Sequence, residues 1–185
     1  MAKLLNDSSG FMILGDSYFL RKGLMRRLIL LLLALAAAPA QATEKVAFFG
    51  MHMLDSSLQT MTLGENPDEA RRLAAMEIMV RERFLEEGYE LVDLAPVAED
   101  LNRVVNPAKC YGCDTRMAQK LGADYSLVGE VQKVSNLILA VNLQLRDAET
   151  GQTVKGGVVD IRGNTDETWE RAMRYLLKNR MFREE

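Results

Sequence analysis

The segment LILAVNLQLR, residues 137–146, carries the clearest structural signal in the chain. Apolar residues occupy every second position, the pattern of a strand with one buried face. Polar side chains at the alternate positions suit a face in contact with water. The apolar set is Leu137, Leu139, Val141, Leu143 and Leu145, and the polar set is Asn142, Gln144 and Arg146. The segment therefore predicts a sheet with one buried face and one wet face.

Two further strands are predicted on either side of this segment. Residues 124–133 form the first, and a turn at Ser135-Asn136 joins it to the central strand. A second turn, at residues 148–151, places a glycine where a positive φ angle is tolerated. Residues 152–161 then return as a third strand, with a bulge predicted at Gly156-Gly157. The three strands form an antiparallel meander.

The preceding region alternates strands and helices. Residues 45–49 are a short apolar run, predicted as a buried strand that ends at Gly50. Asn66 is a good N-cap, and the proline and two acidic residues after it suit the first turn of a helix. That helix is predicted to stop at Gly88. Residues 89–94 then form a second strand.

Three more helices complete the predicted order of elements. Short helices are expected at residues 96–103 and 114–121. Asn164 and Glu167 are predicted to cap a terminal helix, whose apolar stripe is Trp169, Ala172, Met173 and Leu176. The fold class is therefore α+β, or mixed α/β. It consists of a single sheet with a C-terminal three-stranded meander and with helices packed mainly on one face.

Residues 25–42, MRRLILLLLALAAAPAQA, have the three parts of a secretory signal peptide. Two arginines precede an apolar run of 11 residues, and small residues then mark a cleavage site after Ala42. The run is too short to span a membrane, which needs roughly 20 residues. We expect Met25 to be the true start and residues 1–24 to be a non-native upstream extension; the alternative is a long n-region that carries Lys3, Arg21 and Lys22. The processed protein is expected to be periplasmic.

Residues 43–185 form the predicted mature protein, a single domain. They carry 18 basic and 24 acidic side chains, a net charge of −6. This balance argues against nucleic acid or an anionic membrane surface as a partner, because both select for clustered Lys and Arg. Thr43, and not a cysteine, follows the cleavage site, so a lipoprotein anchor is not expected. No membrane span is expected after processing.

Both cysteines lie in AKCYGCDTR, residues 108–116. Haem attachment would need a histidine where Asp114 stands. A zinc site would need four ligands, whereas the chain has only His52 to add to the cysteines. Two hypotheses stay open. Cys110 and Cys113 form a structural disulfide, as nearby thiols tend to do in an oxidising compartment, or they form a redox centre, because a thiol just before a helix has a lowered pKa.

His52, Asp55 and Ser56 resemble the residue set of a hydrolase. All three are predicted to share one loop, and the chain has neither a second histidine nor a Gly-x-Ser-x-Gly motif. A solvated loop explains them better. We therefore predict no catalytic residues.

An oxygen-rich cluster precedes the terminal helix. Asp160, Asn164, Asp166 and Glu167 could together hold Ca²⁺. Helix capping explains the same residues without a metal. No metal and no cofactor are predicted.

Two motifs carry a family resemblance. LGADYSLVGEV, residues 121–131, and LRDAETGQ, residues 145–152, resemble the periplasmic α/β domain of the TolB amino-terminal type and of the curli secretion channel family. GNTDE, residues 163–167, resembles a family of secreted bacterial proteins with no assigned activity. The resemblance implies an α/β fold, an envelope setting, and docking more than catalysis. The β-propeller and the pore-forming strands of the two named families have no counterpart here.

The leading functional prediction is a soluble periplasmic binding or accessory module. It would dock to a periplasmic or outer-membrane protein and have no catalysis of its own. One alternative is a thiol–disulfide redox protein that uses Cys110 and Cys113. A second alternative comes only from the resemblance, which implies an accessory factor of periplasmic quinoprotein alcohol oxidation.

Overall fold

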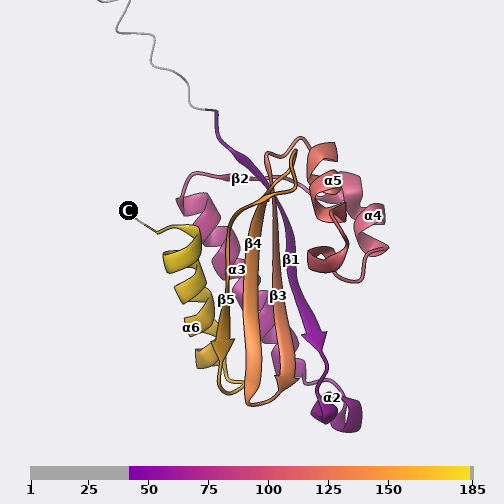
Figure 1. Ribbon diagram of the computed structural model, residues 1–185, viewed down its shortest axis with the longest axis vertical. Coiled ribbons are helices and arrows are strands. Elements are labelled where there is room, and N and C mark those ends of the chain that lie inside the picture. The colour runs from indigo at the N-terminus through magenta and orange to yellow at the C-terminus, as the bar shows by residue number, and fades with distance from the viewer. Residues whose placement is uncertain (1–41, 184–185) are drawn as a thin grey trace, which may run out of the picture. The chain divides into compact units, whose positions relative to one another are not determined.

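The computed structural model describes residues 42–183, which contain one five-stranded sheet with the strand order β2-β1-β3-β4-β5 (Figure 1). The strands are β1 (Lys45–Asp55), β2 (Glu90–Leu91), β3 (Tyr125–Ser135), β4 (Ile138–Asp147) and β5 (Thr153–Ile161). The helical segments are α2 (Leu58–Leu63), α3 (Pro67–Glu86), η1 (Ala95–Val97), α4 (Ala98–Asn102), η2 (Pro107–Lys109), α5 (Cys113–Lys120), α6 (Asp166–Leu176) and η3 (Leu177–Met181). The predicted signal peptide and upstream extension lie outside the described residues.

The predicted meander is confirmed. β3 pairs antiparallel with β4, and β4 pairs antiparallel with β5. β1 lies parallel to both β2 and β3. The sheet therefore joins a parallel N-terminal half to an antiparallel C-terminal half, as the α+β prediction requires.

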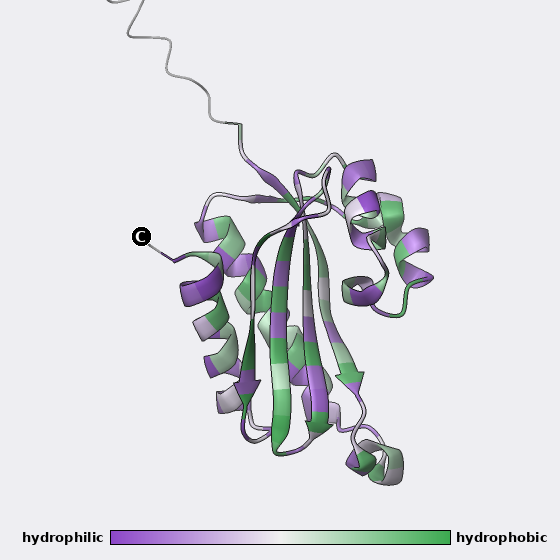
Figure 2. Ribbon diagram, viewed as in Figure 1, coloured by the Kyte–Doolittle hydropathy of each residue, from purple (hydrophilic) through white to green (hydrophobic). Residues whose placement is uncertain are grey.

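The buried face of β4 is shorter than its apolar pattern predicts. Four of the five residues, Leu139, Val141, Leu143 and Leu145, are buried, and polar side chains alternate with them (Figure 2). Leu137 is the exception, with a side chain that is 70% exposed. The reason is that the chain is still turning at this residue and β4 begins only at Ile138.

Helices α3 and α6 cover the face of the sheet on which these leucines lie. Their apolar sides meet the sheet in the larger core, in which Trp169 is buried as predicted. On the opposite face, α5 and the short helices before it cover only one end of the strands (Figure 1). That smaller core includes Phe49, Val97, Met117 and Val128. Helices therefore pack mainly on one face, as predicted.

β1 does not end at Gly50 as predicted. Gly50 has a φ of 88° and lies in a bulge of β1, after which the strand continues to Asp55. Side chains satisfy the backbone there: the N–H of Met51 donates to Glu77 at 2.8 Å, and His52 Nε2 bonds the Phe49 carbonyl at 2.8 Å. A bulge of this kind also protects an exposed strand edge from further pairing.

Two other strand predictions need correction. Gly156 and Gly157 are not a bulge, because they pair in regular register with Gln144 and Leu143. Because Gly157 has no side chain, Arg180 of η3 can pack closely against β5: a Cβ atom at Gly157 would lie 2.8 Å from the Arg180 side chain. The strand predicted at residues 89–94 is only the two residues of β2.

The two long helices differ in how well their caps were predicted. Asn66 caps α3 as expected, accepting the backbone N–H of the residue two positions on at 3.0 Å. The predicted caps of α6, Asn164 and Glu167, are wrong. Thr165 is the N-cap and forms a reciprocal capping box with Thr168, because Asn164 is bound to residues of the core instead.

A buried polar network joins Asn164 to Lys133, near the C-terminal end of β3. Its centre is Lys133, which is only 2% exposed and whose ammonium lies 3.0 Å from Asp55 and 2.7 Å from Glu69. Thr60 of α2 also bonds Lys133, and Asn164 donates to Glu69. Since α2 has no buried residue of its own, this network attaches it to the domain.

Hydrogen bonds within the network keep Asp55 and Lys133 charged although both side chains are largely buried. Burial by itself would raise the pKa of Asp55, but hydrogen bonds from Ser57, Thr60 and Lys133 outweigh it and hold that pKa well below its usual value. Burial likewise opposes the charge of Lys133, and hydrogen bonds to Glu69 and Asp55 raise its pKa. Both groups therefore stay ionised at neutral pH.

Candidate docking site

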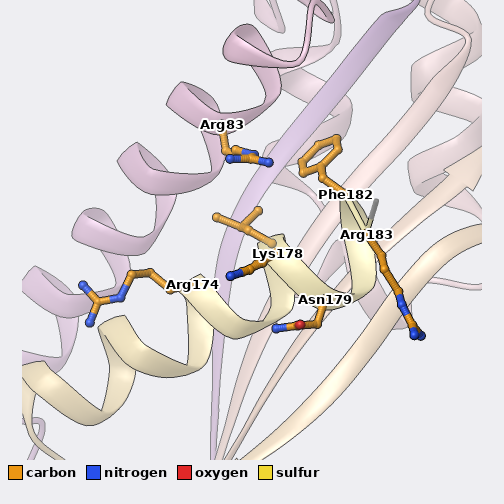
Figure 3. Close-up of a pocket in the computed structure, with 7 residues that line it drawn as sticks. Arg83, Arg174, Lys178, Asn179, Phe182 and Arg183 are labelled. Carbon is orange, nitrogen blue, oxygen red and sulfur yellow. The ribbon is translucent and has the colours of Figure 1, made fainter. Parts of the chain in front are cut away.

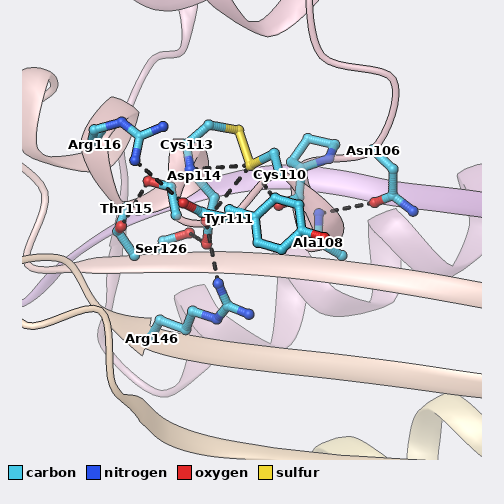
Figure 4. Close-up of a disulfide and its surroundings, with 12 residues drawn as sticks. Asn106, Ala108, Cys110, Tyr111, Cys113, Asp114, Thr115, Arg116, Ser126 and Arg146 are labelled. Atoms are coloured by element: carbon cyan, nitrogen blue, oxygen red, sulfur yellow. Dashed lines mark hydrogen bonds and ion pairs between the residues drawn. A yellow bond between two sulfur atoms is a disulfide. The ribbon is translucent and has the colours of Figure 1, made fainter.

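Cys110 and Cys113 are joined by a disulfide, with their Cα atoms 5.4 Å apart (Figure 4). The bridge connects the end of η2 to the first residue of α5. Both cysteines are half-buried. The disulfide closes a tight ring around Tyr111 and Gly112. Whether it is structural or redox-active stays a prediction.

The ring holds Tyr111 in an unusual conformation. The φ angle of Tyr111 is 54° and that of Gly112 is 84°, so two consecutive residues are left-handed. A non-glycine residue there costs about 1–2 kcal/mol, because its Cβ crowds the following carbonyl. Packing of the Tyr111 side chain does not offset this cost, because the side chain is 99% exposed.

Hydrogen bonds around the ring oppose any relaxation. The N–H of Cys113 donates to the Cys110 sulfur at 3.2 Å, and the Thr115 hydroxyl donates to the Gly112 carbonyl at 3.1 Å. The Arg116 guanidinium bonds the carbonyl of Tyr111 at 3.4 Å. The loop that presents Tyr111 is therefore fixed from within.

A buried carboxylate anchors the ring to the sheet. Asp114, which stands where a haem motif would have histidine, is 1% exposed. It accepts a hydrogen bond from Ser126 of β3 at 2.8 Å and pairs with Arg146 of β4 at 3.4 Å (Figure 4). Arg146 is itself held by Gln144 at 3.0 Å. The polar face of β4 therefore serves as the base of the loop.

A second polar contact fastens the segment before the ring. Glu130 is buried on β3, where Asn106 donates to it at 2.5 Å and Lys109 pairs with it at 3.1 Å. The loop leaves two large side chains in solvent: Tyr111, between these anchors, and Val105, which lies just before Asn106 and is 98% exposed. The arrangement presents an aromatic and an aliphatic side chain on a fixed support.

The residues considered for a hydrolase do not share one loop as predicted. His52 and Asp55 lie three residues apart in β1, and so on opposite faces of the sheet. His52 bonds the bulge carbonyl, and Asp55 belongs to the Lys133 network. Ser56 donates to the backbone of Lys133 at 3.2 Å. Each therefore has a structural partner, and the three are not assembled into one site.

The oxygen-rich cluster is also divided among partners. Asp166 pairs with Arg71 at 2.9 Å and with Arg72 at 2.7 Å, and their hydrogen bonds lower its pKa to about 2. Asn164 is bound within the core, and Asp160 lies exposed on β5. In residues 42–183, no group of three His, Cys, Asp or Glu side chains is arranged to hold a metal ion. None of the helices in this range is long and apolar enough to cross a membrane.

One cluster of basic residues was not predicted from the sequence. Arg174 and Lys178 are four residues apart, which places them on one face of the last helix, and Arg183 follows. Together with Arg83 of α3 they line a groove. The spacing of the first two could have been noticed, but the overall acidic charge concealed it, and the contribution of α3 depends on the fold.

Comparison with protein families gives one match. The DUF3280 family, described as "Protein of unknown function (DUF2380)", matches residues 44–181. No curated protein matches the chain.

Several solved structures are similar to this chain in fold. The LpoB C-terminal domain from Salmonella enterica is 19% identical, with 70% of this chain and 90% of that chain covered and a TM-score of 0.44. Lipoprotein GNA1162 from Neisseria meningitidis is 17% identical, with 66% of this chain and 82% of that chain covered and a TM-score of 0.45. The PelC dodecamer from Paraburkholderia phytofirmans is 16% identical, with 77% of this chain and 89% of that chain covered and a TM-score of 0.39. At these identities and scores, no function transfers to this chain. The comparison with the TolB amino-terminal domain stays a prediction.

Proposed function

The chain belongs to the DUF3280 family, and we propose that it is a non-catalytic binding module that docks to a protein of the bacterial envelope. The observation that carries this proposal is Tyr111, fully exposed at the tip of a disulfide-closed ring and held in a left-handed conformation. Backbone strain of this kind persists where the surrounding structure enforces it, and it concentrates at functional sites.

Tyrosine is well suited to anchor a protein interface. It offers a large amphipathic surface and has only two side-chain torsions to immobilise on binding. Aromatic residues are also enriched among the interface residues whose truncation costs 2 kcal/mol or more. With Val105 exposed on the same loop, the site combines apolar contact area with a phenolic hydroxyl that can hydrogen-bond to the partner.

The support of the loop favours binding in a second way. The ring is tied by Asp114 to β3 and β4, and the preceding segment is tied by Glu130. A loop that is already ordered loses little conformational entropy when it docks. The rigid base therefore supports a role in recognition.

The predicted setting is consistent with this role. A disulfide persists in an oxidising compartment such as the periplasm, and the predicted signal at residues 25–42 would send the chain there. We therefore propose a periplasmic or outer-membrane protein as the partner.

Site-specific photo-crosslinking tests the proposal. A photoreactive amino acid in place of Tyr111 should give a discrete adduct with one envelope protein, which mass spectrometry identifies. The same amino acid in place of Tyr175, an exposed tyrosine on α6, is the matched control and should not. With the purified partner, Tyr111→Ala should weaken binding about 30-fold, as expected for loss of a 2 kcal/mol anchor. Equal adducts at both positions, or unchanged affinity, would refute it. An adduct with a quinoprotein alcohol oxidase would favour the accessory role in that oxidation.

Thiol–disulfide exchange is a second candidate function, favoured by one observation. Cys113 is the first residue of α5, where backbone N–H groups would stabilise a thiolate. This hypothesis predicts a reduction potential well above about −300 mV. A lower reduction potential would eliminate thiol–disulfide exchange and leave the disulfide a structural role.

A further inference from the structure

The groove between α3 and the C-terminal helical segments is lined by positive charge. It has a volume of about 790 Å³, and its lining includes Arg83, Arg174, Lys178 and Arg183. Among residues 42–183, no Asp or Glu lines it, whereas Asn179 contributes an amide. The whole chain has a net charge of −3, so this concentration of cations runs against the overall balance.

Within residues 42–183, several donors in the groove lack partners. Lys178 and Arg183 have no carboxylate within 4.0 Å among the residues that the structure describes, while Arg83 and Arg174 each pair with a glutamate one turn away. The Nε atom of Arg83 is buried and has no hydrogen-bond partner in the same part of the chain. A buried unsatisfied N–H is rare in proteins, and a bound water or ion can satisfy it.

The aromatic ring of Phe182 lies against the upper part of the groove. The guanidinium carbon of Arg83 is 5.3 Å from the ring centre, a cation–π distance that holds the arginine in place. Figure 3 shows Arg83 and Lys178 beside the space between α3 and the C-terminal segments, with Arg174 and Arg183 at its two ends and their side chains extending outward from it. The cations therefore border a common space and are spread along its length.

We propose that this groove binds a small multivalent oxyanion, a ligand that carries two or more phosphate or carboxylate groups. Guanidinium groups bind both kinds of oxyanion through paired N–H donors. Because four cationic side chains line one groove, a ligand with more than one anionic group fits it better than a single charge. The site lies on the α3 and α6 side of the sheet, opposite the disulfide ring, so the inference does not depend on the proposed docking role.

Calorimetric titration with pyrophosphate and with citrate at low ionic strength tests the site. The wild-type protein should bind at least one of them. Lys178→Gln/Arg183→Gln should weaken that binding by at least about tenfold. The control Arg162→Gln/Arg171→Gln removes the same charge from exposed positions outside the groove, and its affinity should stay within about twofold of wild type. Equal losses of affinity in the two double variants would show a non-specific charge effect and overturn the proposal. The proposal would also be overturned if the wild-type protein bound neither pyrophosphate, nor citrate, nor anionic vesicles.

Two additional measurements locate the ligand and its source. Amide NMR signals of residues 83 and 174–183 should shift on titration, and shifts confined to other residues would refute the site. Vesicles of phosphatidylglycerol, compared with phosphatidylcholine, show whether a lipid headgroup is the source of the oxyanion. Vesicle binding that needs Lys178 and Arg183 supports the site with a headgroup as ligand. Binding of the soluble anions without vesicle binding supports it with a free solute.

Discussion

Replacement of Lys133 with methionine should destabilise the domain by about 3–5 kcal/mol, the typical cost of removing one partner from a buried ion pair. In the wild type the ammonium satisfies two carboxylates, at 3.0 Å from Asp55 and 2.7 Å from Glu69, and all three groups are largely buried. Methionine fills a similar volume, so the expected loss comes from stranded charge more than from a cavity. Against a typical stability of 5–15 kcal/mol, this is a large fraction.

The assay is thermal unfolding followed by circular dichroism at pH 7. For a domain of this size the expected loss lowers Tm by about 10 °C or more. The triple variant Asp55→Asn/Glu69→Gln/Lys133→Met removes both stranded charges and should recover most of the stability, because a neutral replacement of a buried ion cluster is often tolerated. A Tm for Lys133→Met within about 2 °C of wild type, or a triple variant no better than the single one, would refute the account of the network.

Three further tests address other parts of the structure. Leu143→Asp should cost several kcal/mol, because it buries an unpaired carboxylate, whereas Gln144→Asp on the polar face keeps an acceptor beside the Arg146 guanidinium and should lower Tm far less; equal Tm values would contradict the assignment of faces. Tyr111→Gly should weaken docking about 30-fold, as for the alanine variant, yet keep stability within about 1 kcal/mol of wild type, because glycine accepts the left-handed conformation; a large fall in Tm would show that the side chain is structural. The lowered pKa of Asp166, about 2, implies a stabilising contribution that is present above about pH 4 and lost as pH falls toward 2. Asp166→Asn should therefore make Tm less dependent on pH in this range, and a pH profile identical to that of wild type would contradict the pairing with Arg71 and Arg72.

The fold was predictable wherever the signal was local. The alternation in β4 and the cap at Asn66 each depend on residues close in sequence, and both are confirmed in the structure. The failures lie where a local signal has a distant competitor. Gly50 looked like the end of a strand, but Glu77 and His52 satisfy the backbone of its bulge and β1 continues.

The candidate docking site was half predictable. Both hypotheses from the sequence paired Cys110 with Cys113, and the disulfide is present; whether it is structural or redox-active stays a prediction. The exposure and left-handed backbone of Tyr111 were not foreseen. The backbone conformation follows from the disulfide-closed ring, and Asp114 anchors that ring to Ser126 and Arg146, which lie 12 and 32 residues further along the chain.

What the sequence by itself determined is the set of elements: an α+β chain with a C-terminal meander, helices mainly on one face, and an aromatic residue between two nearby cysteines. Periodicity and capping are interactions between residues a few positions apart, so the linear order already contains them. Only the tertiary structure decided which polar side chains meet. Asn164 binds Glu69, 95 residues away, and leaves the α6 cap to Thr165. Arg83 joins the cations of the C-terminal segments in one groove. Such partners are brought together by the packing of α3 and α6 on one face of the sheet, and no local pattern encodes that proximity.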